Sequence, residues 1–168
     1  MKALIVSLLA GGAVLLGCSA EETSDPVPVP IAIEFPSTST AVVTQTVRIF
    51  VFDDALECSS LIALRKSERP LPAARVEQIR TPCDLQAGFG LDLARNRNYT
   101  ILVAAEVGDR DLLVGCSRQS AFGQTQAVPV NLVYASTEFT LKTLETEQPG
   151  STSKCTKLSD KCANRCAP

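Results

Sequence analysis

The sequence predicts an all-β protein, a two-sheet antiparallel β-sandwich of seven to eight strands with one short crossover helix and a disulfide-pinned C-terminal segment. Three observations predict this fold. Short runs of β-branched and aromatic residues alternate with turn residues about every ten positions. Only one segment in the middle of the chain has a helical pattern, and the cysteines after residue 18 are even in number. Short, evenly spaced strands of this kind are typical of β-sandwiches.

Residues 1–18 have the parts of a secretory leader. Lys2 supplies a positive charge, and an apolar stretch runs from Ala3 to Leu16. This stretch is shorter than the roughly 20 residues of a membrane-spanning helix, and it suits a leader, which needs about 7–15 apolar residues. The tetrapeptide Leu15-Leu16-Gly17-Cys18 resembles the lipobox of bacterial lipoproteins.

The lipobox resemblance implies that residues 1–17 are a signal peptide and that the lipid is attached at Cys18. In that family the cysteine takes a diacylglyceryl group and its freed amine takes a third chain, palmitate being the usual type. Two or more chains anchor stably, since each buried methylene contributes about 0.8 kcal/mol. Ser19, rather than aspartate, follows the cysteine, which favours the outer membrane, facing either the periplasm or the cell surface. The alternative is an ordinary leader with a chance cysteine.

Residues 18–30 are predicted to form a lipid-anchored tether. The segment is small and acidic at first and ends Pro26-Val27-Pro28-Val29-Pro30. Alternating prolines favour an extended polyproline II conformation of roughly 3.1 Å per residue, which would hold the domain about 35 Å from the lipid.

Residues 31–145 are predicted to form the sandwich domain. The run Leu85–Leu93 alternates most clearly between apolar and polar or glycine positions, so one face is expected to be buried. Asp53 and Asp54 are expected to cap the crossover helix, whose apolar residues lie between Leu56 and Leu64. The predicted strands are Ile31–Phe35, Thr46–Phe52, Arg75–Arg80, Leu85–Leu93, Tyr99–Val107, Asp111–Cys116, Ala127–Tyr134 and Glu138–Thr143.

One hairpin of this domain resembles a known family. The run from Asn98 to Glu106, followed by a turn and by Leu113-Val114-Gly115-Cys116, is similar to the late hairpin of prealbumin-like or carboxypeptidase-regulatory-like (Ig-like) sandwiches of envelope lipoproteins. The resemblance implies a spacer or a binding module, because fold alone does not choose between such functions.

Six cysteines remain after Cys18, three in the sandwich and three in the tail of residues 146–168. An even number of cysteines outside the cytoplasm predicts disulfides. If all six are oxidised, at least one bond must join the tail to the domain, because the tail holds an odd number of cysteines. Cys58 with Cys116 is the favoured pair within the domain, which leaves Cys83 for the tail. The tail residues Cys155, Leu158, Cys162 and Cys166 are spaced as one face of a helix, with caps at residues 151–153. The alternatives are a thiolate metal site or a redox pair, but the chain has no Cys-x-x-Cys.

Composition excludes several classes of function. The chain has no histidine, which excludes a Ser-His-Asp triad, a Cys-His dyad and histidine-ligated metal sites. The formal net charge of −2 without a basic stripe disfavours nucleic acid. Asp53-Asp54 and the pair Asp109 and Asp111 lack the spacing of a calcium loop and are expected to serve capping and turn chemistry. No metal, cofactor or catalytic residue is predicted.

The sequence therefore predicts a non-enzymatic, lipid-anchored envelope protein whose sandwich binds a protein or glycan partner. Edge strands or the connection from Ser59 to Ala74 are the expected binding surfaces, because loops on a rigid sandwich carry most recognition. Two alternatives stay open. The protein could be a spacer in an envelope assembly, or a hydrolase with two carboxylates about 5–10 Å apart. The oligomeric state is left open.

Overall fold

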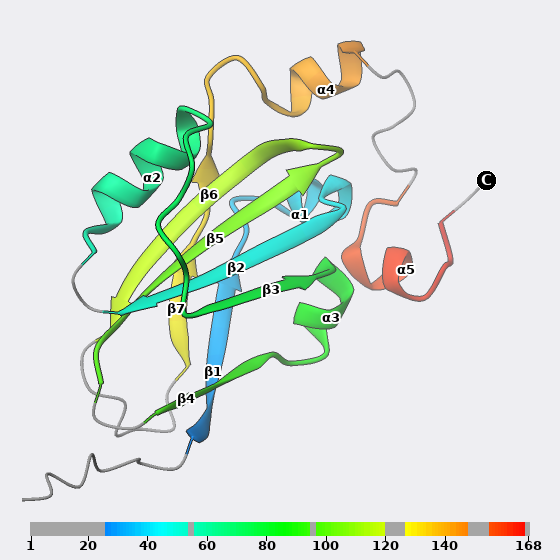
Figure 1. The fold of residues 1–168 in the computed structure, drawn as a ribbon. Helices are drawn as coiled ribbons and strands as arrows, with labels where there is room; N and C mark the ends of the chain where they lie inside the picture. The colour runs from blue at the N-terminus through cyan, green and yellow to red at the C-terminus, as the bar shows by residue number, and fades with distance from the viewer. Residues whose placement is uncertain (1–25, 54–55, 95–96, 120–126, 148–154, 167–168) are drawn as a thin grey trace, which may run out of the picture.

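The computed structural model describes residues 26–53, 56–94, 97–119, 127–147 and 155–166 of the chain, and in them two β-sheets pack into a sandwich (Figure 1). This confirms the predicted all-β class. The smaller sheet has the order β4 (Gly90–Ala94), β1 (Pro26–Glu34), β7 (Val128–Asn131). The larger has the order β3 (Val76–Arg80), β2 (Thr46–Asp53), β5 (Tyr99–Val107), β6 (Arg110–Gln119), β8 (Val133–Tyr134). All pairings are antiparallel except that of β1 with β7.

Strand β5 is the centre of the fold, and each of its nine residues is buried. One face carries Ile101 and Val103 into the main core between the sheets, where Leu91 and Leu93 of β4 meet them. The other face lies under a helix and carries Leu102 into a second, smaller core. Burial on both faces explains why the middle of this strand, residues 101–105, is apolar without alternation.

Within the described ranges, five short helices surround the sheets: α1 (Thr38–Val43), α2 (Cys58–Lys66), α3 (Pro82–Gln86), α4 (Leu141–Glu147) and α5 (Leu158–Cys162). The predicted crossover helix is α2, which lies on the outer face of the larger sheet and buries Leu61 against Phe50, Phe52 and Leu102 (Figure 1). Helix α5 lies against α1 and α3. In the part of the chain that is described, no helix is both long and apolar enough to cross a membrane.

The predicted tether is wrong over residues 26–30, which form the first half of β1 and pair with β4 from Pro26↔Ala94 to Pro30↔Gly90. Prolines are tolerated here because β7 pairs with β1 only from Ile31 onward, so the residues before it need no donors on that side. The alternation that suggested polyproline places Val29 in the core and leaves Pro28 exposed. Residues 1–25, including the predicted signal peptide and Cys18, lie outside the described residues.

Two predicted strands are partly or wholly helical. The predicted strand Leu85–Leu93 begins as helix α3, because Thr81 and Asp84 form a capping box around Pro82, and strand β4 starts only at Gly90. The chain turns between them at Gly88, whose φ of +100° suits glycine. The predicted strand Glu138–Thr143 is wrong, because the Ser136 hydroxyl accepts the N–H groups of Glu138 and Phe139 and so begins a turn before α4.

The predicted helix caps also differ from the structure. Helix α2 begins after Glu57, whereas Asp53 ends β2 and Asp54 lies outside the described residues. In the tail, the predicted long helix reduces to α5, because Asn164 takes a left-handed conformation with φ of 52°. The expected caps at residues 151–153 lie outside the described residues.

Candidate functional site: a charged hollow at one end of the sandwich

The six cysteines after Cys18 pair as three disulfides: Cys58–Cys116, Cys83–Cys162 and Cys155–Cys166. The pairing of Cys58 with Cys116 and of Cys83 with the tail confirms the predictions. The first bond holds the start of α2 on β6, and the second holds α5 on α3, with Cα atoms 5.5 Å and 5.3 Å apart. These cysteines therefore brace the fold, which agrees with an oxidising compartment.

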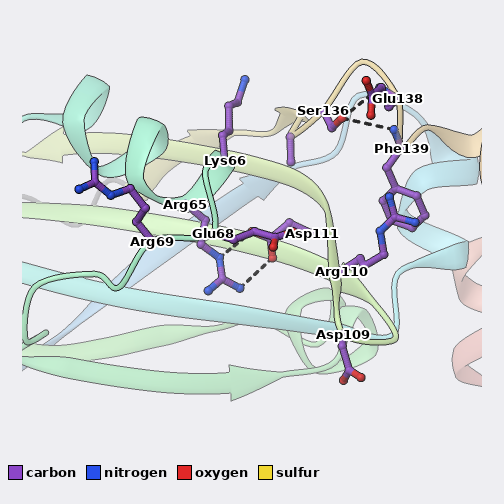
Figure 2. A pocket seen from close by; sticks show the side chains of 11 residues that line it. Arg65, Lys66, Glu68, Arg69, Asp109, Arg110, Asp111, Ser136, Glu138 and Phe139 are labelled. Atoms are coloured by element: carbon purple, nitrogen blue, oxygen red, sulfur yellow. Dashed lines mark hydrogen bonds and ion pairs between the residues drawn. The ribbon is translucent and has the colours of Figure 1, made fainter.

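A hollow of about 510 Å³ lies where three segments meet, and we call it the charged hollow (Figure 2). The first segment is the end of α2 with the loop after it, the second is the turn between β5 and β6, and the third follows β8. Its lining residues are Arg65, Lys66, Glu68, Arg69, Asp109, Arg110, Asp111, Ala135, Ser136, Glu138 and Phe139. Four are basic and four acidic, so the hollow is polar and its formal charge balances.

The floor of the hollow is formed by the guanidinium of Arg65 and the carboxylate of Asp111. Nε of Arg65 donates to Oδ2 of Asp111 at 2.6 Å, and its Nη2 donates to Oδ1 of Asp111 at 2.8 Å (Figure 2). The same Nη2 donates to Oε1 of Glu106 at 2.6 Å. The guanidinium also lies 5.7 Å from the centre of the Phe50 ring. Arg65 thus ties the end of α2 to two strands at once.

Glu106 lies beneath Arg65 and is the one acidic residue on strand β5. Its side chain is only 7% exposed. Arg48 Nε and the Thr46 hydroxyl each donate to Oε2 at 3.1 Å, and Arg48 Nε forms an ion pair with Oε1 at 2.9 Å. The sheet register shifts between Ala105 and Glu106, at a β-bulge of the kind that re-aims side chains. Together with Arg65, these donors satisfy the buried carboxylate.

The pKa values of the Arg65–Asp111 pair follow from burial and pairing. Burial raises the pKa of the Asp111 carboxyl above its ordinary value, and the hydrogen bonds and charge of Arg65 offset only part of that effect. Burial by itself lowers the pKa of Arg65, but the two carboxylates outweigh it and raise that pKa. The arginine therefore stays charged, and the pair acts as a salt bridge.

The wall opposite α2 is built around Arg110 and Phe139. The guanidinium carbon of Arg110 lies 3.9 Å from the centre of the Phe139 ring, a close cation–π contact. Around the rim, Lys66, Arg69 and Asp109 are exposed and point away from the Arg65–Asp111 pair (Figure 2). The hollow thus has a paired charged floor and an exposed rim of both signs.

A second hollow of about 600 Å³ adjoins the first and shares Lys66, Ala135 and Ser136 with it. Its other lining residues are Tyr134, Thr137 and Thr140. Next to it on edge strand β8, Val133 is 53% exposed. The surface beside the charged hollow is therefore mixed, with hydroxyl groups, a phenol ring and the apolar side chain of Val133.

The sequence indicated only part of this site. The predicted connection from Ser59 to Ala74 does line the hollow through Lys66, Glu68 and Arg69. Neither the segment after β8 nor the pairing of Arg65 with Asp111 was predicted. The sequence contained one indication of this network. Glu106 follows the apolar run of a predicted central strand, and a buried carboxylate requires a partner.

The described aspartates among those considered for calcium do not gather into one site, and Asp54 lies outside the described residues. Asp111 is held by Arg65, and Asp109 points away from it on the rim. Asp53 lies 3.6 Å from Arg75 in an exposed ion pair. Within the described residues, no three His, Cys, Asp or Glu side chains are grouped so that they could hold a metal ion.

No family model and no curated protein matches the chain. Among solved structures, the chain is similar to the crystal structure of a fimbrial assembly protein from Parabacteroides distasonis, with a TM-score of 0.31 and 12% sequence identity. The match covers 66% of this chain and 54% of that protein, so the chain spans about half of its length. Similarity at this level assigns no function.

Proposed function

We propose that this protein is a non-enzymatic, lipid-anchored protein of the outer membrane that presents the charged hollow to a protein partner. Two features support the anchor. Leu15-Leu16-Gly17-Cys18 resembles a lipobox, and the three disulfides agree with export to an oxidising compartment. The main support for the binding role is the charged hollow. Paired charges fix its floor, and its charged rim is exposed to solvent.

The arrangement of the carboxylates favours binding over hydrolysis. A carboxylate-dependent hydrolase needs one protonated acid and one free base or nucleophile facing the substrate. Here Asp111 and Glu106 share the guanidinium of Arg65, and Glu106 also accepts from Arg48 and Thr46. Both carboxylates are therefore already paired with arginine and hydroxyl groups of the protein itself, instead of facing a substrate.

The chemistry of the hollow favours a protein partner over a glycan. Glycan sites commonly offer an exposed ring as a platform, but the aromatic residue lining the charged hollow, Phe139, is 3% exposed and lies beneath Arg110. Exposed charges of both signs instead suit a complementary protein surface, where they set orientation and rate of encounter. Arginine and tyrosine are enriched at the energetic centres of protein interfaces. Arg69 lines the charged hollow, and Tyr134 lines the second hollow beside it.

The anchor is tested by the substitution Cys18→Ser in the natural host. We expect the wild type to incorporate labelled palmitate and to sediment with the outer membrane. The variant should incorporate none and should leave the outer-membrane fraction. An unlabelled wild type, or a labelled variant, would remove the anchor from the proposal.

The binding role is tested by photocrosslinking in intact cells. A benzoylphenylalanine replaces Lys66 or Glu138 on the rim in two separate variants, and Glu77 on β3 in a matched exposed control. We expect one discrete protein adduct from both rim positions and none from Glu77. Adducts to glycan alone would show that the partner is a glycan and not a protein. The absence of adducts from both rim positions would favour a role as a structural spacer.

A further inference from the structure

The end of α2 and the turn between β5 and β6, whose residues line the charged hollow, lie at the opposite end of the sandwich from the start of β1 (Figure 1). Strand β1 starts at Pro26, beside Ala94 at the end of β4. The hollow lies at the other end, where β5 turns into β6 after Val107 and where α2 ends. A strand of nine residues, such as β1 or β5, spans about 30 Å. The hollow is therefore about one strand length from Pro26.

The chain between Cys18 and Pro26 is too short for the domain to invert. Eight residue steps separate these positions in the sequence, and even a fully extended chain covers at most about 28 Å in that number of steps. Inversion would require the chain to reach past the whole sandwich, which is about 30 Å long. If Cys18 is held in a bilayer, this short chain therefore opposes full inversion of the domain.

The charge of the hollow also gives it no attraction for a membrane. Anionic lipid surfaces attract clusters of lysine and arginine, each contributing about 1 kcal/mol. The lining of the charged hollow balances four basic residues with four acidic ones. Length and charge thus both favour an aqueous partner over the bilayer as the ligand of this surface.

We infer that the anchor orients the domain, with the end formed by Pro26 and Ala94 toward the membrane and the charged hollow directed away from it. The hollow is then the surface presented to a protein in the aqueous space, beyond the layer next to the lipid. This inference rests on the proposed lipid anchor and adds the direction in which the domain faces.

Energy transfer to a labelled membrane tests the orientation. The lipidated protein is purified from membranes and reconstituted into vesicles of phosphatidylethanolamine and phosphatidylglycerol that carry a headgroup-linked acceptor dye. A fluorescent amino acid replaces Thr137 beside the hollow in one variant and Asp92 on β4 in the other, both exposed positions. Separation by one strand length leads us to expect transfer about twofold stronger, or more, from Asp92. Equal transfer, or stronger transfer from Thr137, would overturn the inference.

A longer chain between lipid and domain provides the matched control. About 20 Gly and Ser residues inserted between Thr23 and Ser24 bring the reach to nearly 100 Å, well beyond the length of the sandwich. We expect the ratio of transfer from Asp92 to transfer from Thr137 to fall toward one. A ratio unchanged by the insertion would show that tether length does not set the orientation and would overturn the argument.

The mass of the intact protein separates failure of this inference from failure of the proposed function. Protein without the added mass of the acyl chains contradicts the lipid anchor itself. Acylated protein with equal transfer from Asp92 and Thr137 keeps the anchor and contradicts only the orientation.

Discussion

The ammonium group of Lys161 donates to the backbone carbonyl oxygen of Thr44 at 2.6 Å, although the two residues lie 117 positions apart in the sequence. The same ammonium donates to the carbonyl oxygen of Val42, also at 2.6 Å. Both carbonyls lie at the C-terminal end of α1, where unpaired carbonyl groups and the helix dipole favour a cation. The tail thus holds the domain by a side chain as well as by a disulfide.

Replacement of Lys161 by methionine should destabilise the protein by about 1–2 kcal/mol, since hydrogen bonds from a charged donor to two helix-end carbonyls are lost. The net destabilisation is smaller than the full energy of these hydrogen bonds. Burial lowers the pKa of Lys161, so the substitution also removes the cost of burying a charge. The free energy of unfolding in urea, with disulfides intact, measures the effect. Lys157→Met, at an exposed position before α5, is the control and should change stability by less than about 0.5 kcal/mol. Equal effects of the two substitutions would contradict the role of Lys161.

Replacement of Arg65 by methionine should cost about 3 kcal/mol, because Glu106 and Asp111 would remain buried without their shared cation. Methionine retains much of the apolar stem, so the loss reports mainly the charge. The measurement is the urea midpoint at pH 7.

The control for this prediction is Arg69→Met, on the exposed rim of the same hollow. We expect a change within about 0.5 kcal/mol, together with a weaker crosslink to the partner. If Arg65→Met were no more harmful than Arg69→Met, the buried network would not be a stabilising feature of the fold.

The capping box of α3 predicts a pH dependence. Asp84 accepts hydrogen bonds from the backbone N–H of Thr81 at 2.7 Å and from its hydroxyl at 2.8 Å, and the backbone bond is the first cause of its lowered pKa. A carboxyl whose folded pKa is lowered stabilises the folded state above the unfolded pKa of about 4, and loses that contribution as pH falls through the folded pKa.

Asp84→Asn should therefore lower the urea midpoint at pH 7, and the gap to the wild type should close as the pH falls below the ordinary aspartate pKa of 3.8. The control is Asp92→Asn on the exposed face of β4, for which we expect no comparable gap at pH 7. A gap for Asp84→Asn that is independent of pH would contradict the capping explanation.

Much of this fold could be predicted from local patterns. The apolar runs of β2 and β5 identify the central strands because burial is encoded residue by residue. The parity of the tail cysteines requires a bond to the domain whatever the topology, and the structure supplies it as Cys83–Cys162. Such inferences succeed because they depend on composition and spacing alone.

The features that were not predicted depend on contacts between residues far apart in the sequence, which local patterns do not encode. The prolines of β1 are compatible with a strand only because β7 leaves their edge unpaired, and this is a property of the assembled sheet. The site was missed for a similar reason. Arg65 and Asp111 are 46 positions apart, and only the packing of α2 against β6 brings them together.

Gly115 on β6 offers a final test, of the close approach between the two sheets. A methyl group at this position would meet the carbonyl oxygen of Asn131 and would lie 2.9 Å from Cδ2 of Leu132, whereas no atom is within 4 Å of one at Gly108. Gly115→Ala should therefore destabilise by about 1–3 kcal/mol, because the added methyl must push β7 and β8 away from β6. Gly108→Ala should cost about 1 kcal/mol through its positive φ of 59° alone. Crosslinking to the partner should also weaken in Gly115→Ala, since Asn131 and Leu132 lead directly through β8 to the wall of the hollow. A Gly115→Ala protein of wild-type stability would contradict the close contact between β6 and the β7–β8 connection.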